Sequence, residues 1–390
     1  MVSVYVVAAS DAERDEERRL RWGDYWFKDS LGAAIGNLGH TITDNVAEAD
    51  VIVNCRGAGV EGLPEWTFNI LWIIGHPDTV TVNECLLYDA VCCESERFAE
   101  HLRGWGIACH HLPGASDMVP MPDVVKQHGA VFVGNWRPGR ELDSRGLPLA
   151  VWGEGWDGKL PEGAWRGPYY PHEGLNELYA SAELLLNDHH EDMERWGFHN
   201  PRHYDIAAVA GKKVPTFAEC AAAIMALVPE KRHMLDLGCG ATLRRGFIGI
   251  DKAAEETGEP WYDTVTGKTG VVRHDLENGL PPIWDVGVIV ADNVLEHINN
   301  LIRLLNDCHK ALLPTGGRIH ITVPNAARSI AAAWSDPTHV RAFTPETFDY
   351  LNVDHPRWQQ YGQSYGFLPW RVLRLVERDR FVDVTMRPAA

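Results

Sequence analysis

The residues with the clearest chemistry lie near position 240. There an apolar run at 233–240 ends in Asp-x-Gly-x-Gly, and a second apolar run ends at Asp251. In a parallel sheet these residues would place a glycine turn and a carboxylate side by side at the carboxyl edge, where ligands bind. Glycine lets the backbone approach a ligand closely, and a carboxylate accepts two hydrogen bonds from a ribose diol. The pattern therefore predicts a site for a nucleoside-type cofactor.

The spacing of these residues disfavours a dinucleotide. Leu243 stands where the third glycine of a dinucleotide-binding turn would be. Only ten residues separate Gly240 from Asp251, whereas a parallel crossover usually takes about a dozen or more. We therefore expect a short loop or a single turn between them, instead of a full helix whose N-terminus meets a pyrophosphate.

Strand-like and helix-like runs alternate along the whole chain, which is typical of an α/β fold. A Pro-rich segment at 112–122 breaks the pattern and resembles a linker. The expected strands are 1–9, 51–54, 70–74, 90–93, 130–133, 149–152, 184–186, 234–237, 247–250, 286–291 and 318–323. The expected helices are 25–38, 96–104, 202–210, 218–228 and 299–312, with a further run at 173–182.

The C-terminal part, roughly 219–390, resembles a class I S-adenosylmethionine-dependent methyltransferase. Five segments carry the resemblance in the expected order, at 235–240, 250–251, 274–275, 292–297 and 314–319. The resemblance implies S-adenosylmethionine as the cofactor. A Rossmann-like unit without a cofactor is the alternative.

By this resemblance, Gly238 and Gly240 allow the methionine part of the cofactor to lie against the backbone, and Asp236 helps to anchor its amino group. Asp251 binds the ribose hydroxyls. The segment between Gly240 and Asp251 is shorter than in the general methyltransferase pattern. This departure concerns the residues that would contact the edge of the cofactor.

The same resemblance also assigns the residues near the adenine and near the methyl group of the cofactor. Asp275, with the backbone of Leu276, faces the adenine amine, and Asp292 or Asn293 borders the methyl group. Asp292 and Asn293 follow the expected strand 286–291. They complete the set of cofactor-binding residues that the sequence predicts.

Methyl transfer to an oxygen needs a base near the acceptor. The candidates are His297, His320 and His339. We favour His339 as the catalytic residue because its segment, 335–343, follows the fifth strand and resembles a subgroup of these methyltransferases. The alternative for that segment is a helix-capping turn in which His339 is structural. His297 and His320 are expected to be structural.

Residues 1–218 carry a second ordered set of polar and glycine-rich segments. They resemble a two-domain GT-B glycosyltransferase of the group-1 and spore-protein-like kind, which implies transfer of a sugar from a nucleotide-sugar. The acid found in many relatives eight residues before the ribose-binding acid is replaced by Gly197. The matching segments are 22–27, 38–40, 70–78, 84, 88–89, 131–137, 152–156, 175–187 and 197–205.

A nucleotide-sugar presents a diphosphate, so its site needs backbone amides and a fixed cation. Gly134 and Asn135 follow a strand, and Arg137 is the first nearby cation and can pair with phosphate oxygens. Asn200 and Arg202 lie where a helix is expected to begin, an end that favours anions. These five residues form the predicted phosphate-binding set.

The resemblance supplies the rest of the predicted sugar-transfer site. It assigns the donor ribose to Asp205. On the acceptor side, His76 and Asp78 end an apolar strand, and either is a candidate base or acceptor clamp. The polar segment 187–192 is expected to be a loop, and we predict no metal site.

The bulk composition limits the class of protein. The chain has 390 residues, which is enough for two or three domains, and a net charge of −18, which argues against a general nucleic-acid-binding surface. No apolar run approaches the length of a membrane span. The eight cysteines lack metal-ligand spacing. A cytoplasmic protein with buried thiols is the expectation.

The fold class we expect is α/β, with three Rossmann-like units. Residues 1–120 would form the acceptor domain of the glycosyltransferase, 121–218 its nucleotide-sugar domain, and 219–390 the methyltransferase. The predicted function is sugar transfer coupled to methylation of a small-molecule or glycan acceptor. The alternative is a methyltransferase with an inactive glycosyltransferase-like binding module.

Overall fold

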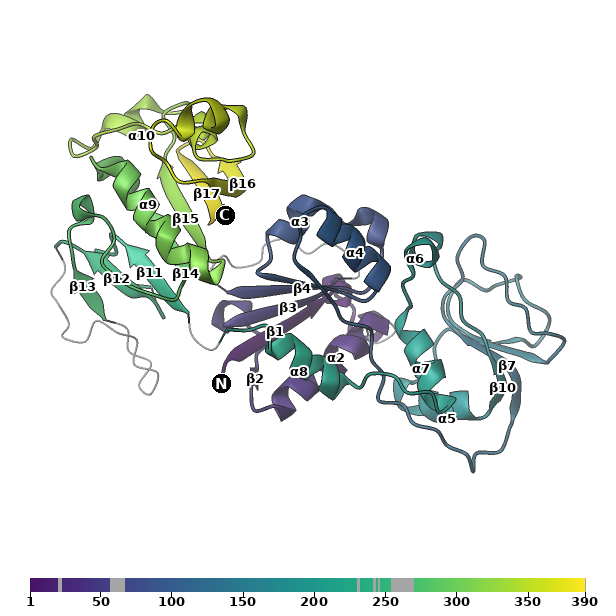
Figure 1. Ribbon diagram of the computed structural model, residues 1–390. Helices are drawn as coiled ribbons and strands as arrows, with labels where there is room; N and C mark the ends of the chain where they lie inside the picture. The colour runs from purple at the N-terminus through teal and green to yellow at the C-terminus, as the bar shows by residue number, and fades with distance from the viewer. Residues whose placement is uncertain are drawn as a thin grey trace. The chain divides into compact units, whose positions relative to one another are not determined.

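A computed structural model describes residues 1–19, 23–56, 67–229, 232–240, 243–244, 246–253 and 270–389 (Figure 1). These residues divide into two compact units, Met1–Val228 and Pro229–Ala390, and each is described by itself. Trp22, which begins one expected segment, lies outside the described residues. No helix within those ranges is long and apolar enough to span a membrane.

The first unit begins with a parallel sheet of six strands in the order β2-β1-β3-β4-β5-β6. The order reverses between β1 and β3, and such a switch point opens a crevice at the carboxyl ends of the strands. The strands are β1 (Ser3–Ala8), β2 (Thr41–Ile42), β3 (Val51–Arg56), β4 (Phe68–Ile73), β5 (Ala90–Cys93) and β6 (Cys109–His111).

Helices cover both faces of this sheet (Figure 1). One core joins α2 and α8 to the sheet through Phe27, Trp72 and Phe217, and the other core lies beneath α4 around Phe98. Strands that are buried on both faces read as nearly continuous apolar runs, which is why β3 and β4 are conspicuous in the sequence. The helices are α1 (Glu16–Arg19), α2 (Gly23–Asn37), α3 (Val82–Leu86), α4 (Glu96–Gly104) and α8 (Phe217–Met225).

A second parallel sheet in the same unit has the order β10-β7-β8-β9. Its core is small and includes Val131, Ala150, Leu178 and Tyr179. Its strands are β7 (His128–Val133), β8 (Leu149–Trp152), β9 (Trp165–Gly167) and β10 (Ala182–Leu185). Its helices are α5 (Leu175–Ala180), α6 (Glu191–Trp196) and α7 (Pro201–Val209).

The compact units separate at 228/229, ten residues after the boundary expected at 218/219. The reason is that α8 packs against α2, with Cys220, Ala221 and Ile224 buried in the core of the first sheet. Its Thr216–Glu219 capping box gives the helix a well-defined start. This helix therefore belongs to the first unit.

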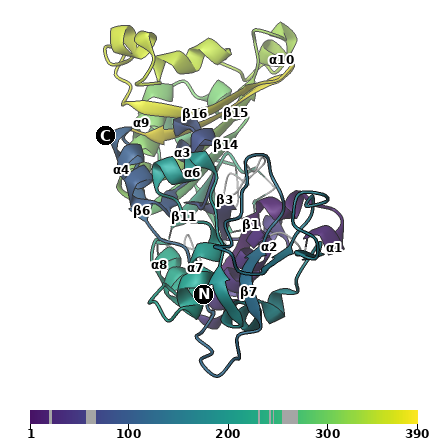
Figure 2. The ribbon, with the colours of Figure 1, turned by 90° about the vertical axis from the view of Figure 1, so that its right-hand side faces the viewer.

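The second unit contains one sheet of seven strands in the order β13-β12-β11-β14-β15-β17-β16. All neighbours are parallel except β17, which is antiparallel to β15 and β16. This antiparallel ribbon, in yellow in Figures 1 and 2, was not expected from the sequence. The elements are β11 (His233–Leu237), β12 (Ile248–Asp251), β13 (Val271–Arg273), β14 (Val286–Asp292), α9 (Leu301–Leu312), β15 (Arg318–Pro324), α10 (Ile330–Trp334), β16 (Trp370–Glu377) and β17 (Phe381–Pro388).

The α/β fold class is confirmed: the described residues form three sheets, two wholly parallel and one mainly parallel. The expected organisation into three separate units remains a prediction, because the first two sheets share one compact unit. The roles assigned to the three domains are also predictions. All eight cysteines are free and buried.

Candidate functional site

In the second unit, the glycine turn and Asp251 meet as the sequence predicts. Strands β11 and β12 are parallel neighbours, and the amide of Gly240 donates a hydrogen bond to Oδ2 of Asp251 at 2.9 Å. The other carboxylate oxygen, Oδ1, accepts from the amide of Ala253 at 2.7 Å. Each oxygen keeps a second lone pair for a ligand hydroxyl. The carboxylate is therefore held in place by backbone at the edge of the sheet.

The backbone of this turn requires glycine. Gly238 and Gly240 have φ angles of +62° and +54°, a region in which a side chain is strained. A Cβ atom at Gly238 would lie 2.6 Å from Cγ2 of Val294. Between Gly238 and Phe247 the described residues form no helix, which agrees with the short crossover expected there.

Arg244, which the sequence analysis did not assign to the site, links two predicted site residues. Its Nη1 donates to Oδ1 of Asp236 at 2.5 Å, and its Nη2 donates to Oδ2 of Asp292 at 2.6 Å. Asp236 is only 1% exposed, and burial raises the pKa of its carboxyl group. A cation thus lies between two acids at the ends of β11 and β14, where the strand order reverses.

The remaining predicted cofactor-binding residues lie at the ends of β13 and β14. Asp275 follows β13 and accepts from the amide of Glu277 at 3.1 Å, which caps the 3₁₀ helix η5 (Leu276–Asn278). Leu276 is buried. Asn293 has a φ of +52°, and its amide donates to the carbonyl of Thr322 at 2.9 Å. The structure thus places every predicted cofactor-binding residue at the carboxyl ends of β11 to β14.

The side chain of His339 lies close to those of Glu296 and His297. Its Nδ1 hydrogen-bonds to the carbonyl of Ala333 at 2.7 Å, and its Nε2 faces Oε1 of Glu296 at 4.0 Å. Glu296 is 1% exposed, and burial raises the pKa of its carboxyl group to about 7. His297 lies beside His339, with ring centroids 4.7 Å apart. His320 is buried and bonded to the hydroxyl of Thr385 at 2.9 Å, which fits its expected structural role.

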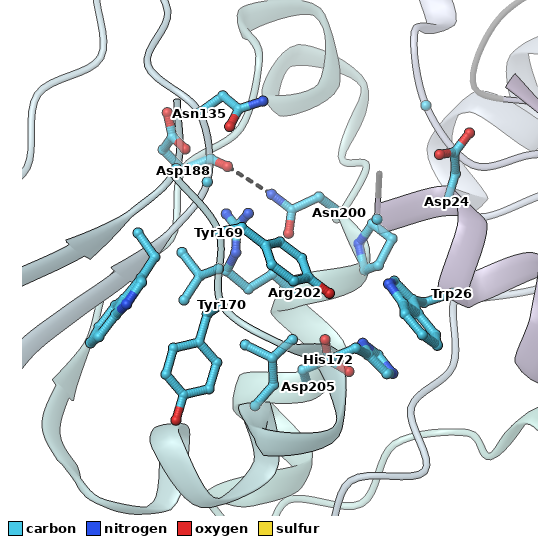
Figure 3. A pocket seen from close by; sticks show the side chains of 18 of the residues that line it. Asp24, Trp26, Asn135, Tyr169, Tyr170, His172, Asp188, Asn200, Arg202 and Asp205 are labelled. Atoms are coloured by element: carbon cyan, nitrogen blue, oxygen red, sulfur yellow. Dashed lines mark hydrogen bonds between the residues drawn. The ribbon is translucent and has the colours of Figure 1, made fainter. Parts of the chain in front are cut away.

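The first unit contains a pocket of about 860 Å³ (Figure 3). It collects residues from the ends of strands in both sheets and from the start of α7. Six predicted residues line it, namely His76, Gly134, Asn135, Asn200, Arg202 and Asp205. Two do not: Arg137 bonds to Asp188 and to the carbonyl of His189, and Asp78 bonds to Arg195 and Trp196.

Arg202 is held in the pocket by close packing. Its guanidinium lies over the ring of Phe132 at 5.0 Å, and its Nη1 donates to Oδ1 of Asn187 at 3.2 Å. A Cβ atom at Gly134 would lie 2.9 Å from Nη2 of Arg202, and one at Gly153 would lie 2.1 Å from the carbonyl oxygen of Gly134. Gly134 therefore lets its loop approach the guanidinium of Arg202 closely, and Gly153 lets a second loop pack against the backbone of Gly134.

The start of α7 adds polar groups to the pocket. Asn200 caps the helix by accepting from the amide of His203 at 3.0 Å, and its own amide nitrogen donates to the carbonyl of Asp188 at 2.8 Å. Asp205, one turn into the helix, accepts from the hydroxyl of Ser116 at 2.7 Å. Burial raises the pKa of Asp205 to about 6.

Several pocket residues were not predicted. Arg140, three residues after the predicted Arg137, lines the pocket and donates to Asp188 at 2.8 Å. Asp24 also lines it, and burial raises the pKa of its carboxyl group. Trp26 stacks on His172 with ring centroids 4.4 Å apart and 3° between the planes (Figure 3). The Trp26 segment resembled a family motif, but only the fold shows that this ring reaches the pocket.

Comparison with protein-family models found no match for this chain, and comparison with curated proteins found none either. Among solved structures, the chain is similar to one described as an S-adenosylmethionine dependent methyltransferase from Mesorhizobium loti, with 18% sequence identity and a TM-score of 0.27. The similarity covers 43% of this chain and 96% of that chain. A likeness this weak supports no conclusion about fold or function.

Proposed function

We propose that the second unit binds S-adenosylmethionine and methylates an oxygen of a small-molecule or glycan acceptor. The observation that carries this proposal is the hydrogen bond from the Gly240 amide to the Asp251 carboxylate, across the ends of two adjacent parallel strands. It brings the backbone of a glycine turn next to a fixed acid, beside the topological switch point between β11 and β14, where α/β sheets bind ligands. When bound, the cofactor would supply an activated methyl group.

The charges beside this turn suit the amino-acid end of that cofactor. A methionine moiety carries an ammonium and a carboxylate. Arg244 can pair with the carboxylate, while Asp236 and Asp292, its present partners at 2.5 and 2.6 Å, can pair with the ammonium. Exchange of the two internal ion pairs for pairs with the ligand would leave each of these charges beside one of opposite sign, which limits the desolvation cost.

The direct test is isothermal titration of the full chain with S-adenosylmethionine and S-adenosylhomocysteine. Asp251→Asn should weaken binding about 10- to 100-fold, since hydrogen bonds to a charged group contribute about 1.5–3 kcal/mol. Asp354→Asn is the matched control, because that carboxylate is in the same unit and pairs with Arg371 at 2.8 Å. No heat of binding to the parent protein, or equal effects of the two variants, would contradict the proposal.

As a second candidate function, we propose that the pocket of the first unit binds a nucleotide-sugar. The supporting observation is that Gly134, Asn135, Asn200 and Arg202 line one pocket with Asp205. Backbone, a helix start and a cation suit a diphosphate, and a carboxylate suits a ribose diol. Aromatic faces such as Trp26 suit a base or a sugar ring.

Titration with a panel of nucleoside diphosphates tests this binding. Arg202→Ala should weaken the best ligand about 10-fold or more, because it removes a cation that pairs with phosphate. Arg166→Ala is the control, since Arg166 is exposed on β9 in the same sheet and does not line the pocket. Equal affinities for the two variants would contradict the proposal.

Hydrolysis of nucleotide-sugars then separates an active transferase from a binding module. His76 and Asp24 line the pocket and are the candidates there for activating an acceptor. Binding together with slow hydrolysis that Asp24→Asn abolishes would support sugar transfer. Binding without hydrolysis would favour the alternative, in which the first unit only holds the acceptor of the methyltransferase. In that case Arg202→Ala would raise the KM of methyl transfer and leave kcat unchanged.

A further inference from the structure

Three potential metal ligands converge in the second unit. Glu296 and His297 belong to the 3₁₀ helix η6 (Leu295–His297), which follows β14, and His339 follows α10. One ligand atom from each residue lies within 4.8 Å of the other two. We call Glu296, His297 and His339 the Glu-His-His cluster. Glu296 lies four residues after Asp292, so the cluster is at the same edge of the sheet as the proposed methyl-donor site.

Neighbouring groups determine which nitrogen of each histidine carries the proton. The carbonyl of Ala333 can only accept, so Nδ1 of His339 donates to it at 2.7 Å. The hydroxyl of Thr338 donates to Oδ1 of Asp336 at 2.6 Å, so its oxygen accepts from Nδ1 of His297 at 2.9 Å. Both neutral rings therefore keep a lone pair on Nε2. Partners of this kind on the far nitrogen are typical of histidines that bind metals.

Glu296 lacks the partners that a buried carboxylate needs. Its side chain is 1% exposed, and neither carboxylate oxygen has a hydrogen-bond partner among the described residues. Asp292 and Asp336 add further negative charge nearby. Burial of a carboxylate without hydrogen-bond partners is costly. A cation between the three ligand atoms would satisfy all of them.

We propose that the Glu-His-His cluster binds a divalent transition-metal ion. Two imidazoles with one carboxylate favour zinc, iron, cobalt, nickel or manganese over magnesium or calcium, which prefer oxygen ligands. Ligand atoms around a tetrahedral zinc lie roughly 3.3 Å apart, given zinc–ligand distances of about 2.0–2.1 Å. Nε2 of His339 and Oε1 of Glu296 are 4.0 Å apart, and the three ligand atoms lie within 4.8 Å of one another, so the side chains would have to draw closer by about 1 Å to bind the ion.

The ion would also change the expected role of His339. As a ligand through Nε2, this residue would not take a proton from the acceptor. The ion would instead bind the acceptor oxygen at an open position and lower its pKa. This role in methyl transfer rests on the function proposed above, whereas the binding of the ion does not.

The test is titration of the chelator-treated full chain with cobalt(II) chloride, followed by visible absorption and by ion content after gel filtration. We expect one ion per chain, displaced by zinc chloride. Glu296→Gln and His297→Ala should each weaken binding at least 100-fold. His355→Ala is the matched control, because His355 is a partly exposed histidine of the same unit whose Nε2 lies 3.7 Å from Asp349, and it should bind as the parent does.

Two further measurements make the result decisive. Thr338→Val removes the hydroxyl that accepts from His297 and donates to Asp336, and it should weaken cobalt binding about 10-fold, even if the Glu296 variant fails to fold. Titration with S-adenosylmethionine, run on the same samples, reports separately on the methyl-donor site. The absence of a 1:1 cobalt complex, or the same affinity in Glu296→Gln and His355→Ala, would overturn the metal proposal whatever the cofactor result.

Discussion

The pocket of the first unit and the strand edge of the second differ in how their polar groups are satisfied before a ligand binds. In the pocket, Arg202 is supported by Phe132 and Asn187, so its remaining donors can meet a ligand without breaking an ion pair. At the strand edge, Arg244 is already paired with Asp236 and Asp292. We infer that the pocket is preorganised, whereas the strand edge must exchange internal ion pairs for ligand contacts.

The two regions also use glycine differently. In the pocket, Gly153 brings one loop against the backbone of another, since its Cβ position is 2.1 Å from the carbonyl oxygen of Gly134. At the strand edge, Gly238 meets the side chain of Val294 and Gly240 meets nothing within 4 Å. Backbone contacts cannot relax as a side chain can. The pocket should therefore be more sensitive than the strand edge to the loss of a glycine.

The largest effect is expected for Gly153→Ala. A φ of +146° and the contact with Gly134 should together destabilise the first unit by about 3 kcal/mol. Gly158→Ala is the control, because Gly158 has a φ of +67° but open space around its Cβ position, and it should cost about 1 kcal/mol. Urea unfolding followed by tryptophan fluorescence measures both. Similar losses would show that the loop contact is unimportant.

Arg244→Ala tests whether the internal ion pairs assist the ligand or exclude it. We expect S-adenosylmethionine to bind about 30-fold more weakly, a loss of about 2 kcal/mol, since the variant lacks the cation that would meet the ligand carboxylate. Calorimetric titration measures this, with Arg371→Ala, which removes the partner of Asp354, as the control. Tighter binding by Arg244→Ala would mean that Arg244 blocks the site.

A pH series on Asp205→Asn tests how strongly the pocket is shielded from water. Because burial raises the pKa of Asp205 from 3.8 to about 6, the unfolded chain loses this proton first as the pH rises. Asp205 should therefore lower the free energy of unfolding progressively between pH 4 and pH 6, by about 2 kcal/mol. The Asn variant should lack this contribution. A constant difference between parent and variant in urea unfolding from pH 4 to 7 would contradict this picture.

The smallest expected effect is a difference in ligand affinity between variants of two neighbouring arginines. Arg140 lines the pocket and Arg137 does not, although both pair with Asp188 at 2.8 Å. Arg140→Ala should weaken nucleoside diphosphate binding about 10-fold, the loss expected for one charged hydrogen bond, and Arg137→Ala should weaken it less than about 2-fold. Titration of both variants with the same ligand decides. The reverse order would restore Arg137 as the phosphate-binding cation.

Much of the fold was predictable because strand and helix signals are local. The expected limits of β5, α4 and β8 coincide with those observed, since each is an apolar or amphipathic run with a clear end. The C-terminal ribbon of β16 and β17 was missed. Its strands combine buried and exposed positions, with Trp370 and Val382 buried and Arg374 exposed, and their pairing is antiparallel in a sheet that is otherwise parallel.

The sequence by itself determined the meeting of Gly240 and Asp251, because the end of a buried strand and the carboxyl edge of a parallel sheet follow from local pattern and topology. Only the tertiary structure decided the partners of these groups. Arg244 reaches Asp292 across 48 residues of sequence, and Glu296 meets His339 across a similarly long stretch of the chain. Such contacts depend on how loops pack over the sheet, and no periodicity in the sequence records that packing.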